Sequence, residues 1–223
     1  MRNLVTVSAG TSQPSTTRML ADRIAAESIE RLRDLDITAT TGAIEVAPLA
    51  VDVARASVTG VPSAELEAAI EQVAAADAVI AAAPVYKAGL SGLFKSFVDV
   101  LDDDVLIAKP VVLAATAGSS RHALVVDEQM RSLFAYMRAL TLPTSVFAAP
   151  EDWGAAELGE RVRRAATELA VVVQSQIEKG IADRAWSGYR HEFGGNATRA
   201  EQTTADTDFD SPLMRLAAGG RAD

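Results

Sequence analysis

The chain has 223 residues, 49% of them apolar, and a formal net charge of −9, so nucleic acid and anionic membrane surfaces are poor partners. The complete absence of cysteine excludes disulfides, thiolate catalysis and cysteine-ligated metal. The two histidines, His122 and His191, are too far apart in the sequence to suggest a metal site.

The chain begins with a predicted strand at residues 3–8, followed by a long helix that starts near Ser15. The connecting stretch, residues 8–18, is rich in serine and threonine. A strand, a tight turn and a helix N-terminus together favour anion binding, because the first-turn N–H groups lack intrahelical partners and the helix dipole is positive there. The alternative is an ordinary strand-to-helix loop in which Ser15 is only the N-cap.

The next quarter of the chain contains an outer strand and a central strand. Alternating apolar and polar residues at 37–46 predict a strand with one exposed edge, and residues 47–62 predict a loop with room for one turn of helix. Ser63 is the expected N-cap of the following helix. The continuous apolar run at 78–84 is typical of a parallel strand covered on both faces.

The second half continues this alternation, with a loop at 85–92 and further strands at 110–115 and 144–148. Three more helices are predicted from apolar stripes: Leu93, Phe97 and Leu101; Val126, Met130, Leu133, Phe134 and Met137; Leu158, Val162, Leu169 and Val173.

Five strands alternating with five helices predict an α/β fold, a three-layer sandwich around a five-stranded parallel sheet in the order 2-1-3-4-5. We expect one domain over residues 1–182. Residues 183–223 are polar and glycine-rich, and we expect a partly mobile extension there.

Three loops carry residues suited to a planar, phosphorylated ligand. In an open α/β sheet ligands bind outside the carboxyl ends of the strands, where the strand order reverses, here between the first and third strands. Loop 8–17 offers hydroxyls and helix N–H groups, loop 84–92 offers backbone amides and Tyr86, and loop 116–122 offers small residues that allow close approach to a ring edge.

These motifs together resemble those of the NAD(P)H-dependent FMN reductases, a family with the flavodoxin-like fold. The resemblance covers residues 4–178 and is greatest to an actinobacterial-type branch of the reductase components of two-component flavin monooxygenases. The residues that carry it are Pro84-Val85-Tyr86, Gly89, Ser91-Gly92-Leu93, Phe94-Lys95, Asp99, the turn Thr116-Ala117-Gly118-Ser119 and the first-loop segment Pro14-Ser15-Thr16-Thr17-Arg18.

The resemblance implies a role for each loop in binding FMN. The residues implied to hold the phosphate are Ser8, Ser15, Thr16 and Thr17. Those implied to run beside the N5/O4 side of the isoalloxazine are Pro84, Val85, Tyr86 and Lys87. Those implied to contact its pyrimidine edge are Thr116, Ala117, Gly118 and Ser119. The implied chemistry is hydride transfer from nicotinamide C4 to flavin N5, for which we expect no catalytic side chain and no metal.

One departure from the family concerns charge. Many relatives have an arginine about where Gln13 stands, and Arg18 and Arg121 are the nearby cations that remain. A neutral cradle can still bind phosphate through hydroxyls and the helix dipole, but the missing charge favours loosely held flavin.

The resemblance also implies FMN with NADPH or NADH as cofactors, delivery of reduced FMN to a partner monooxygenase, and a homodimer or homotetramer. Apolar surface on the helices over 93–101 and 130–137 agrees with self-association. One alternative is a reductase that keeps FMN bound and reduces a quinone, azo dye or metal oxyanion. Another is a flavodoxin-type electron carrier. Loop 84–92 argues against a carrier, because the loop is short and lacks a run of acidic residues for docking a partner.

The remaining expectations concern location and single residues. No apolar run approaches a membrane span and no basic-then-apolar leader is present, so we expect a cytoplasmic protein. Tyr86 is expected to form a ligand wall rather than a core contact. His122 is expected at the surface, with contact to the nicotinamide as the alternative, and residues 102–104, three aspartates, are expected to form a solvated turn.

Overall fold

The structure is a computed structural model that describes residues 1–186. Its strands are β1 Arg2–Ser8, β2 Ala39–Glu45, β3 Ala78–Tyr86, β4 Gly89–Leu90, β5 Pro110–Thr116, β6 Leu140–Thr141 and β7 Val146–Ala148. Its α-helices are α1 Thr16–Arg33, α2 Ala50–Thr59, α3 Ala64–Ala75, α4 Gly92–Asp99, α5 Arg131–Tyr136, α6 Ala156–Ser175 and α7 Ile177–Ala185. Three short helical turns complete the fold: η1 Ser120–His122, the π-helical η2 Val126–Met130 and η3 Pro150–Asp152.

The sheet confirms the predicted doubly wound topology. Its parallel strands run in the order β2-β1-β3-β5, and both β6 and β7 pair with β5 as the outermost position. The predicted fifth strand at 144–148 is therefore shorter and has a second part upstream. Pro143 lies in the interruption, where its missing N–H cannot support a strand ladder.

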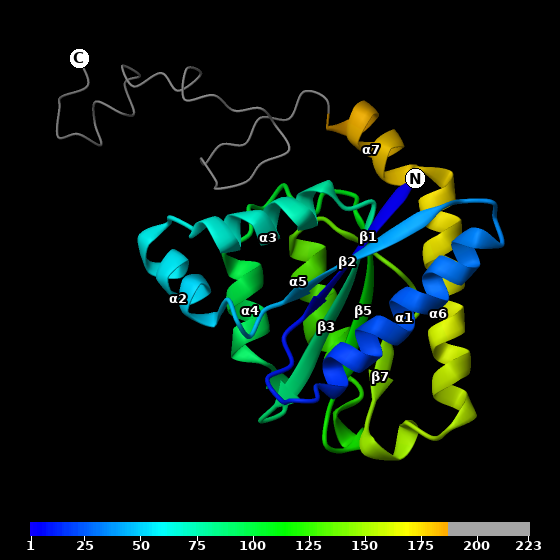
Figure 1. The fold of residues 1–223 in the computed structure, drawn as a ribbon, viewed down its shortest axis with the longest axis horizontal. Coiled ribbons are helices and arrows are strands. Elements are labelled where there is room, and N and C mark those ends of the chain that lie inside the picture. The colour runs from blue at the N-terminus through cyan, green and yellow to red at the C-terminus, as the bar shows by residue number, and fades with distance from the viewer. Residues whose placement is uncertain (187–223) are drawn as a thin grey trace.

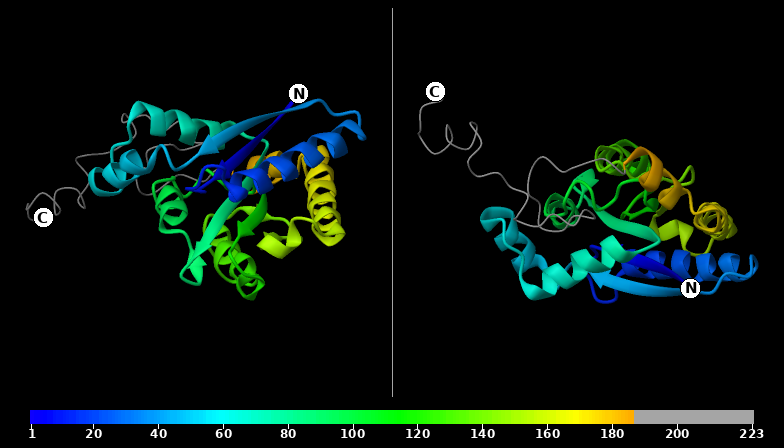
Figure 2. Two further views of the ribbon diagram at one scale, coloured as in Figure 1. Left: turned by 60° about the horizontal axis from the view of Figure 1, so that its bottom comes forward. Right: turned by 90° about the horizontal axis from the view of Figure 1, so that it is seen from above.

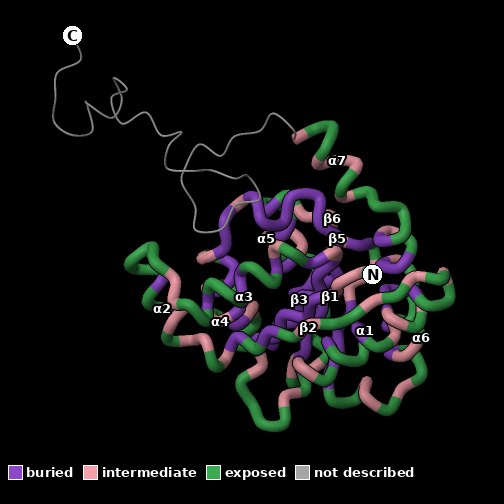
Figure 3. The backbone as a smooth tube through the Cα atoms, turned by 45° about the horizontal axis from the view of Figure 1, so that its top comes forward, coloured by how far each residue is buried: buried purple, intermediate pink, exposed green. Residues whose placement is uncertain are grey.

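Helices cover both faces of the sheet, which gives the expected three layers. Figures 1 and 2 show α1 and α6 together on one face, with α3, α4 and α5 on the other. The side chains of β3 explain this arrangement: Val79 and Ala81 pack into one core and Ile80 into the other. The central strands are accordingly buried along their length (Figure 3).

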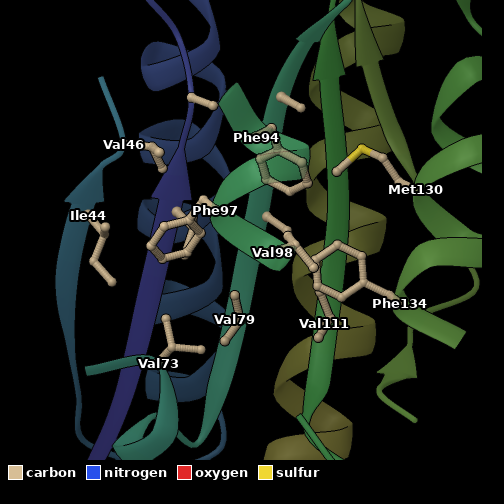
Figure 4. Close-up of a cluster of buried hydrophobic side chains, with 14 of the residues drawn as sticks. Ile44, Val46, Val73, Val79, Phe94, Phe97, Val98, Val111, Met130 and Phe134 are labelled. Atoms are coloured by element: carbon tan, nitrogen blue, oxygen red, sulfur yellow. The ribbon is translucent and has the colours of Figure 1, made fainter. Parts of the chain in front are cut away.

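The larger core lies under α4 and α5, where aromatic and branched side chains interlock (Figure 4). Phe94 and Phe134 face each other with ring centroids 6.3 Å apart. α4 buries Phe94, Phe97 and Val98, whereas the predicted core residue Leu93 is only partly buried. Phe94, Phe97 and Val98 follow the i, i+3, i+4 spacing of one helix face, and Leu93 lies beside that face.

Two predicted loops contain regular structure. The prediction of a loop at 47–62 is wrong for its centre, because α2 forms there with Val53 and Ala56 buried and Gly60 ending it in the left-handed conformation. Its N-cap, Leu49, has no capping side chain, so the usual signal for a helix start is missing. The prediction of a loop at 85–92 is also wrong in part, because β3 continues to Tyr86 and turns back into β4 as a hairpin.

The aspartates at 102–104 also differ from expectation. Asp102 and Asp104 are buried, 6% and 3% exposed, so the prediction of a solvated turn fails for them. The backbone N–H of Asp104 donates to the Asp102 carboxylate, which folds this turn back onto itself.

The C-terminal part was predicted as an extension from residue 183. That boundary lies within α7, and the predicted mobile stretch beyond residue 186 lies outside the described residues. Among the residues that the structure describes, no helix combines the length and apolar character needed to cross a membrane.

Candidate functional site

The three predicted loops leave the sheet at one edge. Ser8 at the end of β1 lies beside Ala82, Pro84 near the end of β3 lies beside Thr116, and Thr116 lies beside Ala148 of β7. All of these strands are parallel, so their carboxyl ends meet at the same edge, on either side of the reversal between β1 and β3.

The first loop is built around the N-terminus of α1. Ser15 is the N-cap, as predicted, and its hydroxyl accepts a hydrogen bond from the N–H of Arg18 at 3.2 Å. Gly10 folds against this cap so closely that a Cβ there would lie 1.9 Å from Ser15 Oγ. The first-turn N–H groups of Thr16 and Thr17 precede the first bonded amide, so they are donors for an external acceptor.

The first turn of α1 contains no acidic residue to interact with the positive end of the helix dipole. Its last turn contains two basic residues. By contrast, the first turn of α3 contains Glu65 and Glu67, the usual choice at a helix N-terminus. The start of α1 therefore keeps its positive dipole end free of protein carboxylates on its own first turn, as an anion site requires.

A buried hydrogen bond joins the first and third loops. The hydroxyl oxygens of Thr17 and Thr116 lie 2.7 Å apart, and both residues are nearly inaccessible. The resemblance implied that they contact opposite ends of the flavin. Their mutual bond links the two loops and leaves each hydroxyl two of its three hydrogen-bonding positions. Their contacts with the flavin stay predictions.

A second hydrogen bond joins the first loop to the hairpin. The hydroxyls of Thr11 and Tyr86 lie 3.0 Å apart, and the Tyr86 side chain is half-exposed, at 49%. The ring of Tyr86 therefore lies at the surface, at this edge of the sheet, and does not pack in the core. Thr11 was missing from the predicted site, because nothing in its local sequence indicates a partner 75 positions away.

The hairpin leaves one backbone segment facing away from β4. Ser91 N–H donates to the carbonyl of Pro84 at 3.0 Å, so in the antiparallel pair the next residues, Val85 and Leu90, form the pair without mutual hydrogen bonds. The N–H of Val85 consequently points away from β4 and toward β5, where Pro84 pairs with Thr116, so it belongs to the sheet, and the Val85 side chain packs in the core.

The third loop ends in η1, whose N-cap is Ser119. Arg121 Nε donates to His122 Nε2 at 3.2 Å, which occupies one ring nitrogen of His122. Nearby, the carboxylate of Glu151 accepts hydrogen bonds from its own backbone N–H and from the Ser120 hydroxyl, and these lower the pKa of Glu151 below its ordinary value.

The cation nearest the first loop is already neutralised. Arg18 donates to Asp22 at 2.7 Å and pairs with Glu45 at 2.9 Å. The hydrogen bond to Asp22 is the main reason that the pKa of Arg18 is raised above its ordinary value. Arg18 is therefore directed to protein carboxylates. The first loop then offers a phosphate the helix dipole and hydroxyls, and Arg121, bonded to His122 through Nε, is a cation on the third loop.

The predicted site residues divide by exposure. The buried ones are Ser8, Thr17, Pro84, Val85 and Thr116; the partly buried ones are Ser15, Ala117 and Ser119; the exposed ones are Thr16, Tyr86, Lys87 and Gly118. The exposed members are accessible to a ligand at this edge of the sheet, and the buried members belong to the strand ends and helix start that support them. Their individual roles toward FMN stay predictions. No group of three or more potential metal ligands occurs in the part of the chain that the structure describes.

Comparison with known proteins gives three consistent matches. Residues 2–154 match the family model described as NADPH-dependent FMN reductase. The NADH-dependent FMN reductase SfnE of Pseudomonas putida is 39% identical over 173 residues, which cover 74% of this chain and 88% of that protein. An FMN reductase (NADPH) of Pseudomonas aeruginosa is 36% identical, over 78% of this chain and 94% of that protein.

A solved structure agrees. The crystal structure of an oxidoreductase from Corynebacterium diphtheriae is 43% identical, has a TM-score of 0.76, and covers 78% of this chain and 98% of its own.

Proposed function

This chain belongs to the family of NADPH-dependent FMN reductases, and on that premise we propose that it reduces FMN with NADPH or NADH and releases the reduced flavin to a partner monooxygenase. The reductase activity and its cofactors follow from the family. We propose two further points: that the reduced flavin is released, and which residues bind FMN.

The residues present fit FMN. The start of α1 supplies hydroxyls and first-turn N–H groups, free of acidic residues in that turn, for a phosphate. The end of β3 and its turn, Pro84 to Lys87, lie at the same edge, where the half-exposed ring of Tyr86 can form a wall beside the isoalloxazine. The bound isoalloxazine supplies the hydride-accepting chemistry. The task of the protein is therefore to bind and orient, and no side chain needs to act as acid, base or nucleophile.

One observation carries the release of the flavin: the guanidinium of Arg18 is engaged by Asp22 and Glu45 and is not available to the phosphate. A charge-assisted hydrogen bond is roughly twice as strong as a neutral one. A cradle of hydroxyls and amides therefore holds FMN less tightly than one that contains a free arginine. Weak binding suits a flavin that is exchanged at each turnover.

The test uses the purified full chain. We expect oxidation of NADPH or NADH to depend on added free FMN, and gel filtration to remove any flavin that copurifies. Background oxidation with excess FMN would contradict the reductase activity. Flavin retained at one molecule per chain would contradict release and support the alternative, an enzyme that keeps FMN and reduces a quinone, azo dye or metal oxyanion.

Further parts of the proposal concern organisation. We propose that residues 1–182 form the reductase domain and residues 183–223 an extension, since the curated relatives above cover only about three quarters of this chain. We also propose a homodimer or homotetramer, supported by the exposed side chains of Tyr136 at the end of α5 and Leu124 ahead of η2. A cytoplasmic location suits an enzyme that depends on NADPH or NADH.

A further inference from the structure

One side chain outside the predicted site grips the hairpin that follows the central strand. Gln129 Oε1 accepts a hydrogen bond from the N–H of Leu90 at 3.0 Å, and Gln129 Nε2 donates to the carbonyl of Ala88 at 3.4 Å. These are the outward-facing backbone groups of the hairpin, since the Pro84–Ser91 pair is bonded internally. The Gln129 amide thus bonds to one backbone donor, Leu90 N–H, and one acceptor, the Ala88 carbonyl, that do not bond to β3.

The hairpin turn is one that its sequence does not favour. Lys87 and Ala88 both adopt the left-handed conformation, with φ of 51° and 61°. Two successive left-handed residues define the type I′ turn, for which asparagine and glycine are preferred, because a Cβ is crowded there. A Lys-Ala turn therefore needs support from outside the hairpin, and the contact with Gln129 supplies it.

The segment that carries Gln129 is anchored on both sides, although Gln129 itself is exposed. It lies on η2, a π-helical segment whose two ends, Val126 and Met130, are completely buried. Asp127 of the same segment accepts from Arg131 at 2.7 Å and from the Ser145 hydroxyl at 3.0 Å. π-helical turns often occur at functional sites. Here the π-helical turn η2 carries Gln129, whose side-chain amide contacts the hairpin.

We infer that Gln129 is a positioning residue for flavin binding: it holds the Tyr86–Gly89 turn so that Pro84 to Lys87 stay aligned along the ligand edge. That the ligand is FMN rests on the proposed function. That Gln129 stabilises the turn does not. Without the amide the turn samples conformations that do not bind, and apparent affinity falls in proportion to the competent fraction.

The main variant is Gln129→Ala, and its matched control is Glu128→Ala, an exposed neighbour on the same turn. Loss of two neutral hydrogen bonds predicts a dissociation constant for FMN about fivefold to tenfold higher, with kcat at saturating FMN changed less than about twofold. A second substitution, Ala88→Gly, removes the crowded Cβ from the turn. The double variant Gln129→Ala/Ala88→Gly should regain most of the lost affinity.

A second readout needs no ligand. The N–H of Ser91 bonds to Pro84 and not to Gln129, so its hydrogen exchange reports opening of the hairpin without a direct contribution from the Gln129 side chain. In the flavin-free protein we expect Gln129→Ala to speed this exchange measurably relative to wild type and to Glu128→Ala, and Ala88→Gly to slow it again.

The outcomes separate the two proposals. Unchanged Ser91 exchange in Gln129→Ala overturns the positioning role, whatever happens to FMN binding. Weaker FMN binding that Ala88→Gly does not restore overturns it too, because Gln129 would then act by direct contact. If the wild-type chain neither binds FMN nor oxidises NADPH in its presence, the proposed function fails, while the exchange of Ser91 still tests the grip of Gln129 on the turn.

Discussion

Thr16, an exposed residue at the first position of α1, offers a test of the phosphate end in which stability and affinity move differently. A carboxylate in the first turn interacts favourably with the helix dipole, by about 0.3–1 kcal/mol. The same carboxylate repels a phosphate bound to that turn. We expect Thr16→Glu to keep or slightly raise thermal stability while weakening FMN binding about tenfold or more, measured by flavin fluorescence titration.

The matched control for that prediction is Thr167→Glu, the same substitution at an exposed position in α6. It adds the same charge to the whole molecule away from the first turn of α1, so FMN affinity should stay near the wild-type value. Equal affinity in Thr16→Glu and Thr167→Glu would mean that the phosphate does not lie at the start of α1.

At the scale of elements, the N-terminus of α1 depends on the close approach of Gly10 to its cap. A Cβ at Gly10 would lie 1.9 Å from Ser15 Oγ, so Gly10→Ala must displace the capping hydroxyl. Loss of a serine cap costs about 1 kcal/mol. We expect a lower free energy of unfolding by that amount, measured in urea on the flavin-free protein.

Gly154 provides the comparison, because a Cβ there meets no atom within 4 Å. Gly154→Ala should change the free energy of unfolding by less than about 0.5 kcal/mol. If both alanine variants behave alike, the packing of Gly10 on Ser15 contributes nothing to the helix start, and the cap is not tightly held by the loop.

At the scale of the whole molecule, two large side chains are exposed near α5: Tyr136 at its end and Leu124 ahead of η2. Tyr136 and Leu124 are 69% and 66% exposed, and Leu133 is only partly buried against the core. An exposed apolar surface of this kind typically marks an interface. We expect light scattering at micromolar concentration to show a dimer or tetramer, and Tyr136→Glu to shift it toward monomer.

Val58→Glu in α2 is the control, since Val58 is 87% exposed on a different helix and the substitution adds the same charge. Its oligomeric state should match the wild type. A monomeric wild-type chain, or a Tyr136→Glu variant that assembles normally, would contradict self-association through α5.

The sequence alone was enough to predict the architecture, because period and apolar content are local properties. The unbroken apolar run at 78–84 required a strand covered on both faces, and that strand is β3 at the centre of the sheet. Ser15 and Ser63 marked two helix starts correctly. The order of the three loop motifs pointed to the family, and the family model agrees.

The tertiary structure decided what depends on partners far apart in the chain. Thr17 meets Thr116 across 99 positions, and Gln129 meets Leu90 across 39, and no local pattern records either contact. Arg18 pairs with Asp22 four positions along its own helix, but only the fold brings its second partner, Glu45, to it. The physical reason is that periodicity specifies which face of an element is buried, whereas a hydrogen-bond partner depends on where two elements finally meet.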